Sequence, residues 1–195
     1  MSEPTNDLSI EQLDVLGADD ARFVASLIRT TPDFPKKGIL FRDFTPIMTN
    51  AKALRLMLEA LERTLPVPAG QIDLIAGLEA RGFLMGPALA AHLGKGFVPV
   101  RKAGKLPPRT LKESYDLEYG SASIEIETSA VSNGQRVLIV DDLIATGGTA
   151  HAAARLIEQA GGIVAGFSFV MELQGLDGRS ALGDYPITAL TKMPA

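Results

Sequence analysis

The sequence contains no cysteine and no tryptophan, and it has no long uninterrupted apolar run. The lack of cysteine excludes disulfide bonds and thiolate metal sites, and it is compatible with a reducing cytoplasm. Without an apolar run of about 20 residues, there is no candidate transmembrane helix. The polar, acidic start MSEPTNDLSIEQLD does not have the pattern of a secretory signal peptide. We therefore expect a soluble, cytoplasmic protein that does not associate with a membrane.

The sequence also lacks an excess of positive charge. The chain has 19 Lys and Arg residues against 23 Asp and Glu residues, for a formal net charge of −4. No overall basic field would attract nucleic acid, so we expect no nucleic-acid partner. A length of 195 residues with 46% hydrophobic residues suits a single domain with a substantial core. We expect one domain over residues 1–195, with residues 1–15 as a mobile leader.

Two common nucleotide-binding motifs are missing. A P-loop requires Ser or Thr after Gly-Lys, but the Gly-Lys pairs at residues 94–95 and 104–105 are followed by Gly and Leu. A dinucleotide fingerprint requires G-x-G-x-x-G, and the only Gly-x-Gly, at residues 94–96, lacks the third glycine. Any phosphate site in this chain must therefore be of another kind.

Short apolar segments alternate with segments of helical periodicity. Strands are expected at residues 73–78, 97–100, 121–128, 137–140, 163–173 and 186–191. Helices are expected at residues 19–32, 50–66, 86–94 and 149–161. This alternation predicts an α/β fold with a largely parallel sheet, in which ligands bind beyond the carboxyl ends of the strands. Residues 101–120 show no period and are expected to form a long loop.

The segment RVLIVDDLIATGGTA, residues 136–150, places two adjacent carboxylates at the end of an apolar strand. Asp141 and Asp142 repel each other, so they need a partner: a metal ion, a basic side chain, or a ligand with hydroxyl donors. A glycine-rich turn follows, between the strand and a helix. Its residues are Ala145, Thr146, Gly147, Gly148 and Thr149.

This turn can bind a phosphate group. Its glycines allow successive backbone N–H groups to converge, and the helix that follows adds the positive end of its dipole. Taken by itself, a tight turn with a capping threonine is a slightly better interpretation. If the phosphate belongs to a ribose, however, Asp141 and Asp142 can accept hydrogen bonds from the two vicinal hydroxyls. Their negative charge would also favour a positive charge that develops on the ribose ring.

This arrangement resembles the signature of the phosphoribosyltransferases. The segments PKKGILFRDFTPI, LEARGFLMGPALA, GFVPVRKAGKLP and YDLEYG precede it in the order seen in the adenine phosphoribosyltransferase family. The resemblance spans residues 34–173. It implies a type I phosphoribosyltransferase-like fold, with a mostly parallel twisted sheet flanked by helices and a small hood built from N-terminal segments.

The resemblance also implies an activity. A pentosyltransferase of this family converts adenine and 5-phosphoribosyl 1-pyrophosphate (PRPP) to AMP and pyrophosphate, in purine salvage. Mg²⁺ would be carried by PRPP, with no metal site formed by the protein itself. The family further implies a homodimer, because some basic residues reach the active site of the neighbouring subunit.

Individual site residues follow from the same resemblance. Asp141, Asp142 and the glycine-rich turn would bind the phosphoribosyl group. The pyrophosphate site would consist of Glu79, Ala80, Arg81, Arg101, Lys102 and Lys105. Adenine would contact the backbone of Leu40, the side chain of Arg42 and the side chain of Leu173. Glu118 would be the catalytic acid/base, with Tyr119 closing over the reactants at the end of a lid over residues 104–119.

Other conspicuous residues have simpler interpretations. His92 and His151 lack a second ligand at metal spacing, and the acidic residues of the segment SIEIET are expected to face solvent. Lys95 and Lys112 are expected to be solvated charges. Two alternatives stay open: a phosphoribosyltransferase for another nucleobase (guanine, hypoxanthine, xanthine or a pyrimidine), or a non-catalytic nucleotide-sensing regulator of the same fold.

Overall fold

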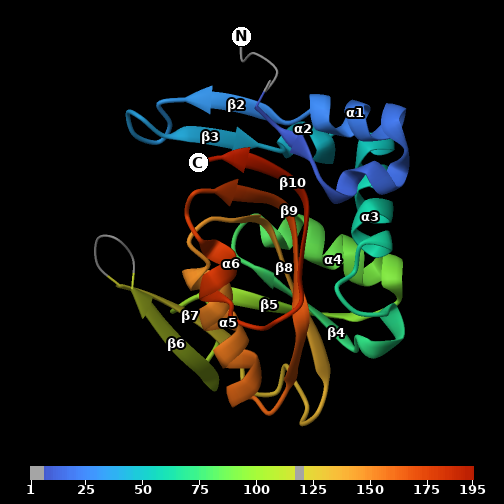
Figure 1. Cartoon of the computed structure of the whole chain (residues 1–195). Coiled ribbons are helices and arrows are strands. Elements are labelled where there is room, and N and C mark those ends of the chain that lie inside the picture. The colour runs from blue at the N-terminus through green and yellow to red at the C-terminus, as the bar shows by residue number, and fades with distance from the viewer. Residues whose placement is uncertain (1–6, 117–120) are drawn as a thin grey trace.

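The computed structural model describes residues 7–116 and 121–195 (Figure 1). Within these ranges, one sheet of eight strands runs through the molecule, in the order β1-β10-β9-β8-β4-β5-β7-β6. Its strands in chain order are β1 (Ser9–Ile10), β4 (Leu74–Leu78), β5 (Gly96–Lys102), β6 (Thr110–Asp116), β7 (Ser121–Glu127), β8 (Arg136–Ile144), β9 (Ile163–Gln174) and β10 (Ile187–Pro194). The central strands β10, β9, β8, β4 and β5 are parallel, whereas β1 and the β6–β7 hairpin are antiparallel additions. The expected mostly parallel sheet is confirmed.

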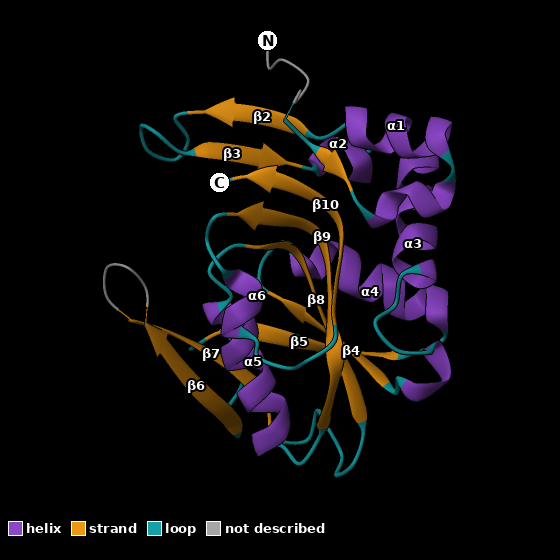
Figure 2. Ribbon diagram, in the orientation of Figure 1, coloured by secondary structure: helices purple, strands orange, loops and turns teal. Residues whose placement is uncertain are grey.

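Helices cover both faces of this sheet (Figure 2). The α-helices are α1 (Ala18–Ser26), α2 (Thr45–Met48), α3 (Ala51–Arg63), α4 (Gly82–Leu93), α5 (Gly148–Gln159) and α6 (Gly178–Ala181), and two short 3-10 helices are η1 (Gln12–Leu16) and η2 (Ala69–Gln71). Along β8, Leu138 and Val140 join the core beneath α3 and α4, and Val137 and Ile139 join the core beneath α5. Successive side chains of a strand point to opposite faces, so burial on both faces explains the continuous apolar run of β8.

A second, two-stranded sheet forms a small hood at one end of the molecule. The strands β2 (Arg29–Pro32) and β3 (Leu40–Asp43) pair antiparallel, and they lie beside α1, α2 and the end of β10 (Figure 1). The hood is built from N-terminal segments, as expected. The predicted helix over residues 19–32 is too long, because α1 ends at Ser26 and the chain continues into β2.

The N-terminal segment, expected as a mobile leader, contacts β10 and the core. Ser9 and Ile10 pair with Thr191 and Lys192 of β10, and Leu13 in η1 is fully buried. Burial of an apolar side chain and the added strand hydrogen bonds favour this docked position over a free tail. Residues 9–15 thus lie docked on β10 and against the core, and the mobility of the leader stays a prediction.

Local signals predict the helices well where their ends are marked. The Asn50 side chain accepts a hydrogen bond from the Ala53 N–H at 3.0 Å and begins α3. Gly94 ends α4 in the left-handed conformation, with φ of 66°. The predicted start of α4 at residue 86 is wrong, because the helix begins at Gly82 and contains Pro87.

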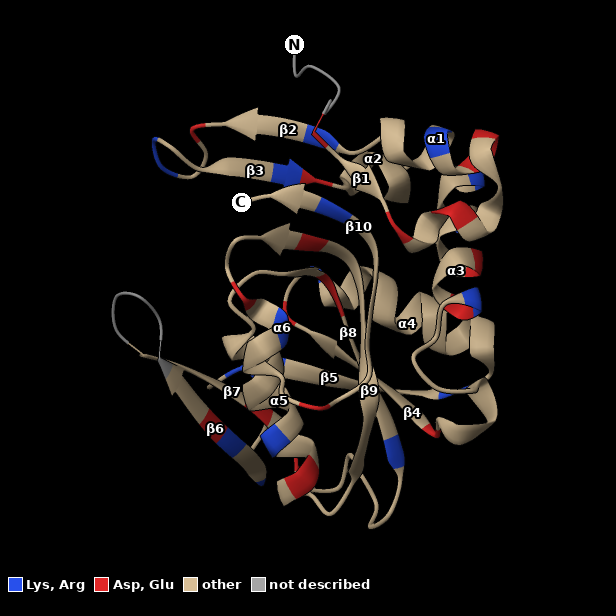
Figure 3. Ribbon diagram, viewed as in Figure 1, with Lys and Arg blue, Asp and Glu red and all other residues tan. Residues whose placement is uncertain are grey.

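Charged residues do not gather on a single element. Figure 3 shows Lys and Arg scattered over several helices and strands, with Asp and Glu among them. Among the helices of the described ranges, none has the length and the apolar character needed to cross a bilayer.

Candidate active site

Three loops lie at one edge of the sheet, where the parallel strands β4, β5 and β8 end. One cavity of about 120 Å³ is lined by Leu78, Asp141 and residues 143–150. A second, of about 330 Å³, is lined by Leu78, Glu79, Val100, Lys102, Tyr115, Ala122, Ile124, Asp141 and Thr149. Leu78, Asp141 and Thr149 contribute to both cavities. The glycine-rich turn and the ends of β4 and β5 therefore face adjoining spaces, with Asp141 between them.

The glycine-rich turn is fixed by close packing against α6. Gly147 has φ of 81°, and a Cβ atom there would lie 2.5 Å from the carbonyl oxygen of Gly178. Gly178 in turn approaches Ala145, because a Cβ atom at Gly178 would lie 2.2 Å from the Ala145 oxygen. Both positions thus require glycine. The packing holds Ala145, Thr146, Gly147, Gly148 and Thr149 at the start of α5, where backbone N–H groups and the helix dipole favour an anion.

Asp141 and Asp142 have different surroundings. Asp142 is buried, and its Oδ2 pairs with Arg81 Nε at 2.6 Å. Asp141 lines both cavities and accepts a hydrogen bond from the Asp142 N–H at 2.9 Å. A basic side chain is thus the partner of Asp142, which leaves the Asp141 carboxylate to face a ligand.

Burial has a strong effect on this pair. It raises the pKa of Asp141 well above the ordinary value, and the neighbouring Asp142 carboxylate raises that pKa further. Burial also raises the pKa of Asp142, although the Arg81 guanidinium opposes this rise. A ligand that donates hydrogen bonds to the ionised Asp141 carboxylate would therefore relieve an unfavourable buried charge.

Arg81 connects the sheet edge with the hood. In addition to its ion pair with Asp142, its guanidinium lies 5.4 Å from the centre of the Phe41 ring in β3. Gly82 follows, and a Cβ atom there would lie 2.8 Å from the Val140 oxygen, so α4 can begin this close to β8 only with glycine. The peptide bond between Glu79 and Ala80 is cis.

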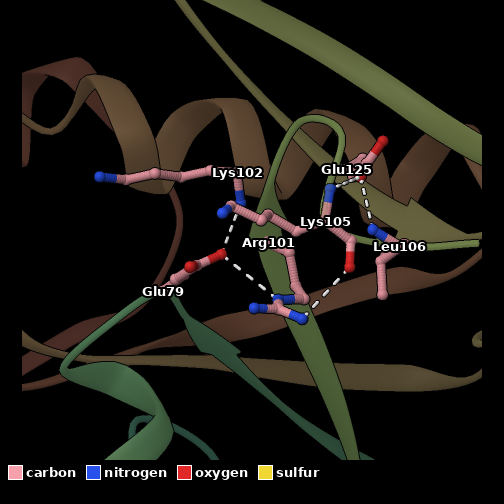
Figure 4. Close-up of polar contacts among 6 residues, drawn as sticks. All are labelled: Glu79, Arg101, Lys102, Lys105, Leu106 and Glu125. Carbon is pink, nitrogen blue, oxygen red and sulfur yellow. Dashed lines mark hydrogen bonds and ion pairs between the residues drawn. The ribbon is translucent and has the colours of Figure 1, made fainter.

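Glu79 holds the end of β5 in place (Figure 4). Its Oε2 accepts hydrogen bonds from the Lys102 N–H at 2.9 Å and from Arg101 Nε at 3.3 Å. The hydrogen bond from Lys102 is the main cause of a lowered pKa of Glu79, and Arg101 adds to it. Glu79 thus holds Lys102 where it lines the larger cavity, and Arg101, bound to the same carboxylate, also donates from Nη1 to the Lys105 carbonyl at 3.2 Å.

Glu125 is a functional candidate that the sequence interpretation missed. It was expected to face solvent, but its side chain is buried, and its Oε1 accepts hydrogen bonds from the backbone N–H groups of Lys105 and Leu106 at 2.9 and 3.0 Å. Its Oε2 accepts a hydrogen bond from Thr110 Oγ1 at 3.2 Å. Burial alone would raise the pKa of Glu125, but the N–H donors of Leu106 and Lys105 outweigh this effect and lower the pKa. The expectation is wrong because the turn after β5 folds over the outward face of β7.

The long loop expected after β5 is partly a strand. Residues 110–116 form β6 and pair with β7 over its whole length, from Thr110 with Glu127 to Asp116 with Ser121. Leu111 and Tyr115 lie on the same face of β6 and pack against the core beneath α5. Tyr115 also lines the larger cavity, a position that no sequence signal singled out. The predicted catalytic residues Glu118 and Tyr119 lie outside the described residues.

The predicted base-binding residues lie in β3 of the hood and in β9 of the main sheet. Arg42 is only 3% exposed, and Nη2 donates to the Pro194 carbonyl at 3.0 Å, which joins β3 to the end of β10. Leu173 pairs with Met193 in the neighbouring strand and is half-buried, whereas Leu40 at the start of β3 is exposed. Arg42 Nε is buried and has no hydrogen-bond partner among the residues that the structure describes. A buried donor without a partner requires an explanation, and a ligand, a water molecule or an ion can supply the missing acceptor.

Comparison with known proteins identifies the relatives of this chain. Residues 46–177 match the family model of the phosphoribosyl transferase domain. The adenine phosphoribosyltransferase of Bifidobacterium longum subsp. infantis is 63% identical over 190 residues, which cover 97% of this chain and 98% of that protein. The adenine phosphoribosyltransferase of Thermobifida fusca is 50% identical over 175 residues, covering 90% of this chain and 98% of that protein.

Solved structures give the same result. The crystal structure of adenine phosphoribosyltransferase from Thermoanaerobacter pseudethanolicus matches with a TM-score of 0.85 and 53% identity, covering 88% of this chain and 99% of that chain. The Saccharomyces cerevisiae enzyme, complexed with D-2,5-dideoxy-2,5-imino-altritol 1,6-bisphosphate and adenine, matches with a TM-score of 0.81 and 47% identity. That match covers 88% of this chain and 98% of that chain.

Proposed function

The chain belongs to the phosphoribosyltransferase family, and on that premise we propose that it transfers the phosphoribosyl group of PRPP to adenine. The products are AMP and pyrophosphate, so the reaction is a step of purine salvage. The observation that carries this proposal is the position of the Asp141 carboxylate between the cavity of the glycine-rich turn and the cavity at the ends of β4 and β5.

Each part of PRPP has a counterpart in this arrangement. The 5-phosphate would bind the N–H groups of residues 145–149 at the start of α5. The ribose hydroxyls would then donate to Asp141, while Asp142 keeps Arg81 in place. A carboxylate beside the ribose also stabilises the positive charge that develops on the ring as the bond to pyrophosphate breaks.

The pyrophosphate group would lie in the larger cavity. Its negative charge would be balanced by Lys102 and Arg101, which Glu79 positions. Lys105, in the turn that Glu125 holds, would add a third positive charge. The backbone of Ala80 and the remaining N–H groups of Arg81 would donate hydrogen bonds to the pyrophosphate. Mg²⁺ prefers oxygen ligands and is commonly held by one or two carboxylates together with substrate phosphates. Asp141 offers such an oxygen, so the residues present fit Mg²⁺ that arrives with PRPP. When bound, the ion would neutralise charge on the leaving pyrophosphate.

The transfer requires one bond to form and one to break at the anomeric carbon. The ring nitrogen of adenine attacks this carbon, and the oxygen of pyrophosphate leaves with the bonding electrons. The proton on the attacking nitrogen must also depart, and we assign its removal to Glu118. Tyr119, beside it, would shield the reacting atoms from water. The described strands β6 and β7 flank these two residues.

Adenine would bind beneath the hood. The backbone of Leu40 would recognise the edge of the base, Leu173 would pack against its face, and Arg42 Nε would donate to a ring nitrogen. The unpartnered, buried Nε of Arg42 supports this last contact.

A homodimer and a cytoplasmic location complete the proposal. Leu84, on the first turns of α4, is 47% exposed and adjoins Phe83, whose ring lies 5.9 Å from the Arg101 guanidinium. The homodimer rests on the family resemblance, and the exposed Leu84 side chain is the position at which we test it. The absence of cysteine is compatible with the reducing cytoplasm.

A base-specificity assay tests the proposed function. The purified protein, Mg²⁺ and PRPP would be incubated separately with adenine, hypoxanthine, guanine, xanthine, uracil and orotate, and nucleotide formation would be measured. We expect AMP from adenine and no product from the other bases, with a decrease in kcat of about 10²-fold or more in Glu118→Gln. Turnover of another base would contradict the assignment of the base site. Binding of PRPP without turnover of any base would support a nucleotide-sensing regulator instead.

A further inference from the structure

The Arg42 guanidinium lies where three separate parts of the chain meet. Arg42 itself is in β3, Asp7 precedes β1, and Pro194 is the last residue of β10. Arg42 Nη1 donates to Asp7 Oδ1 at 3.1 Å, and Nη2 donates to Asp7 Oδ2 at 2.7 Å. The carboxylate therefore binds both terminal nitrogens of the guanidinium at once.

Two further bonds hold the same group. Nη1 donates to Thr30 Oγ1 at 2.6 Å, and Nη2 donates to the Pro194 carbonyl at 3.0 Å. A guanidinium has five N–H donors, and these four bonds use the four on its terminal nitrogens. Nε is the fifth, and it is buried without a hydrogen-bond partner among the described residues. A buried, charged donor without an acceptor is unfavourable, so a ligand is its expected partner.

Asp7 determines the direction of this free donor. A carboxylate that binds both terminal nitrogens fixes the plane of the guanidinium, because the two parallel bonds form only when the groups are coplanar. Thr30 and Pro194 then prevent rotation within that plane. Because the guanidinium can neither tilt nor rotate, the N–H bond at Nε points in one fixed direction.

The segment that carries Asp7 is itself held in place. Ser9 and Ile10 form β1 on the edge of β10, Leu13 is buried, and Glu11 pairs with Lys192 at 3.5 Å. Asp7 thus reaches Arg42 from a docked strand. This anchoring reduces the conformational entropy that Asp7 loses when it pairs with Arg42.

We propose that Asp7 is a positioning residue for base recognition, which fixes the Arg42 guanidinium so that Nε donates to an unprotonated ring nitrogen of the base. This inference rests on the proposed function, because it places the base beside Arg42. A nucleobase that carries a proton at the same ring position would leave two donors facing each other, and the site would reject it. The N-terminal segment therefore takes part in substrate selection.

The test compares three variants of the full-length protein. Asp7→Asn replaces one carboxylate oxygen with an NH₂ group, which cannot accept a hydrogen bond from Arg42. Arg42→Lys removes the planar fork. Glu11→Gln is the matched control, since it weakens another ion pair of the same segment without touching Arg42. For each variant, kcat, the KM for adenine, the KM for PRPP and the Tm would be measured.

We expect Asp7→Asn to raise the KM for adenine roughly tenfold, the effect of losing one hydrogen bond to a charged group. The KM for PRPP should match that of Glu11→Gln, whereas the Tm should fall below it, because the buried Arg42 guanidinium loses its counter-charge. In the Arg42→Lys background, Asp7→Asn should have no further effect on the KM for adenine, because both changes act through one guanidinium.

Other results would overturn the proposal. An unchanged KM for adenine in Asp7→Asn would overturn the role of Asp7 but would leave the proposed function intact. Equal increases in both KM values, or additive effects of Asp7→Asn and Arg42→Lys, would show that Asp7 acts only on stability or through another group. If the wild-type protein does not use adenine, the proposed function and the role of Asp7 fail together.

Discussion

Asp141 and Asp142 are neighbours in the sequence, yet their partners give them different properties. Asp142 is neutralised by Arg81 at 2.6 Å, whereas Asp141 lines both cavities. Burial and the Asp142 charge raise the pKa of Asp141 well above the ordinary value. The ionised form of Asp141, which the ribose hydroxyls require as an acceptor, is therefore lost at a higher pH than for an exposed aspartate.

This difference predicts a shift in the pH dependence of activity. In Asp142→Asn, the negative charge beside Asp141 disappears, and its loss lowers the pKa of Asp141. We expect the acidic limb of kcat/KM for PRPP to move to lower pH. The pH profiles of the wild type and the variant would be compared at the same Mg²⁺ and PRPP concentrations.

The exposed Asp184 provides a control for this comparison, since Asp184→Asn changes the net charge equally at a distance from the pair. Its profile should coincide with that of the wild type. An acidic limb of Asp142→Asn that stays in place or moves to higher pH would contradict the assigned coupling.

Among the elements, β7 and the turn after β5 depend on each other through Glu125. The carboxylate accepts two backbone hydrogen bonds from residues 105 and 106, and Thr110 at the start of β6 supplies a third. In consequence, one side chain fixes the path of the segment that carries Lys105. The pKa of Glu125 is lowered because these N–H donors outweigh the effect of burial.

Glu125→Gln should therefore destabilise the protein in a pH-dependent way. A carboxyl with a lowered folded-state pKa contributes stability above its unfolded pKa, and this contribution is lost as the pH falls through the folded-state pKa. We expect the variant to lose about 1 kcal/mol of unfolding free energy at neutral pH, with the difference from the wild type vanishing in acid. Urea unfolding measured from pH 7 down to pH 3 checks this.

Glu127 lies two residues further along β7 and is exposed, so Glu127→Gln serves as the matched control. We expect it to leave the unfolding free energy within about 0.5 kcal/mol of the wild type. A pH-independent loss in Glu125→Gln, or an equal loss in the control, would argue against the role of the Glu125 charge. The KM for PRPP should rise only in Glu125→Gln, because Glu125, unlike Glu127, accepts hydrogen bonds from the Lys105 turn.

In the whole molecule, two arginine side chains connect the hood with the sheet. Arg81 reaches the Phe41 ring, and Arg42 bonds the end of β10. The proposed base site lies between these two parts, so their relative position would determine its width. A second subunit that packs on α4, beside Arg81, would restrict that position further.

The proposed homodimer gives a direct prediction. Analytical ultracentrifugation of the purified protein should give a mass of twice the 20.7 kDa chain. Leu84→Asp introduces a charge at the exposed apolar position of α4 and should shift the equilibrium toward the monomer. The exposed Ile163 at the start of β9 offers a control, and Ile163→Asp should leave the mass unchanged. A wild-type protein that sediments as a monomer at micromolar concentration would exclude the dimer.

Sequence alone determined the features that depend on residues close together along the chain. The α/β class follows from the apolar periods of the strands and helices, and the glycine-rich turn is recognisable because its glycines, threonines and preceding aspartates are contiguous. The capped start of α3 at Asn50 is local in the same sense. The family signature adds the chemistry, because its motifs are short segments of this kind.

Tertiary structure decided every feature that joins distant segments. Arg42 bonds Asp7, 35 residues earlier, and Pro194, 152 residues later, and no local pattern announces either partner. Likewise, the alternation of apolar and charged residues in β7 does not reveal that the turn after β5 buries Glu125. Nothing in the N-terminal segment reveals that it docks on β10. A charge in the interior is stable only with its partners, and the fold, which buries the apolar faces of the strands and helices, determines which partners come within reach.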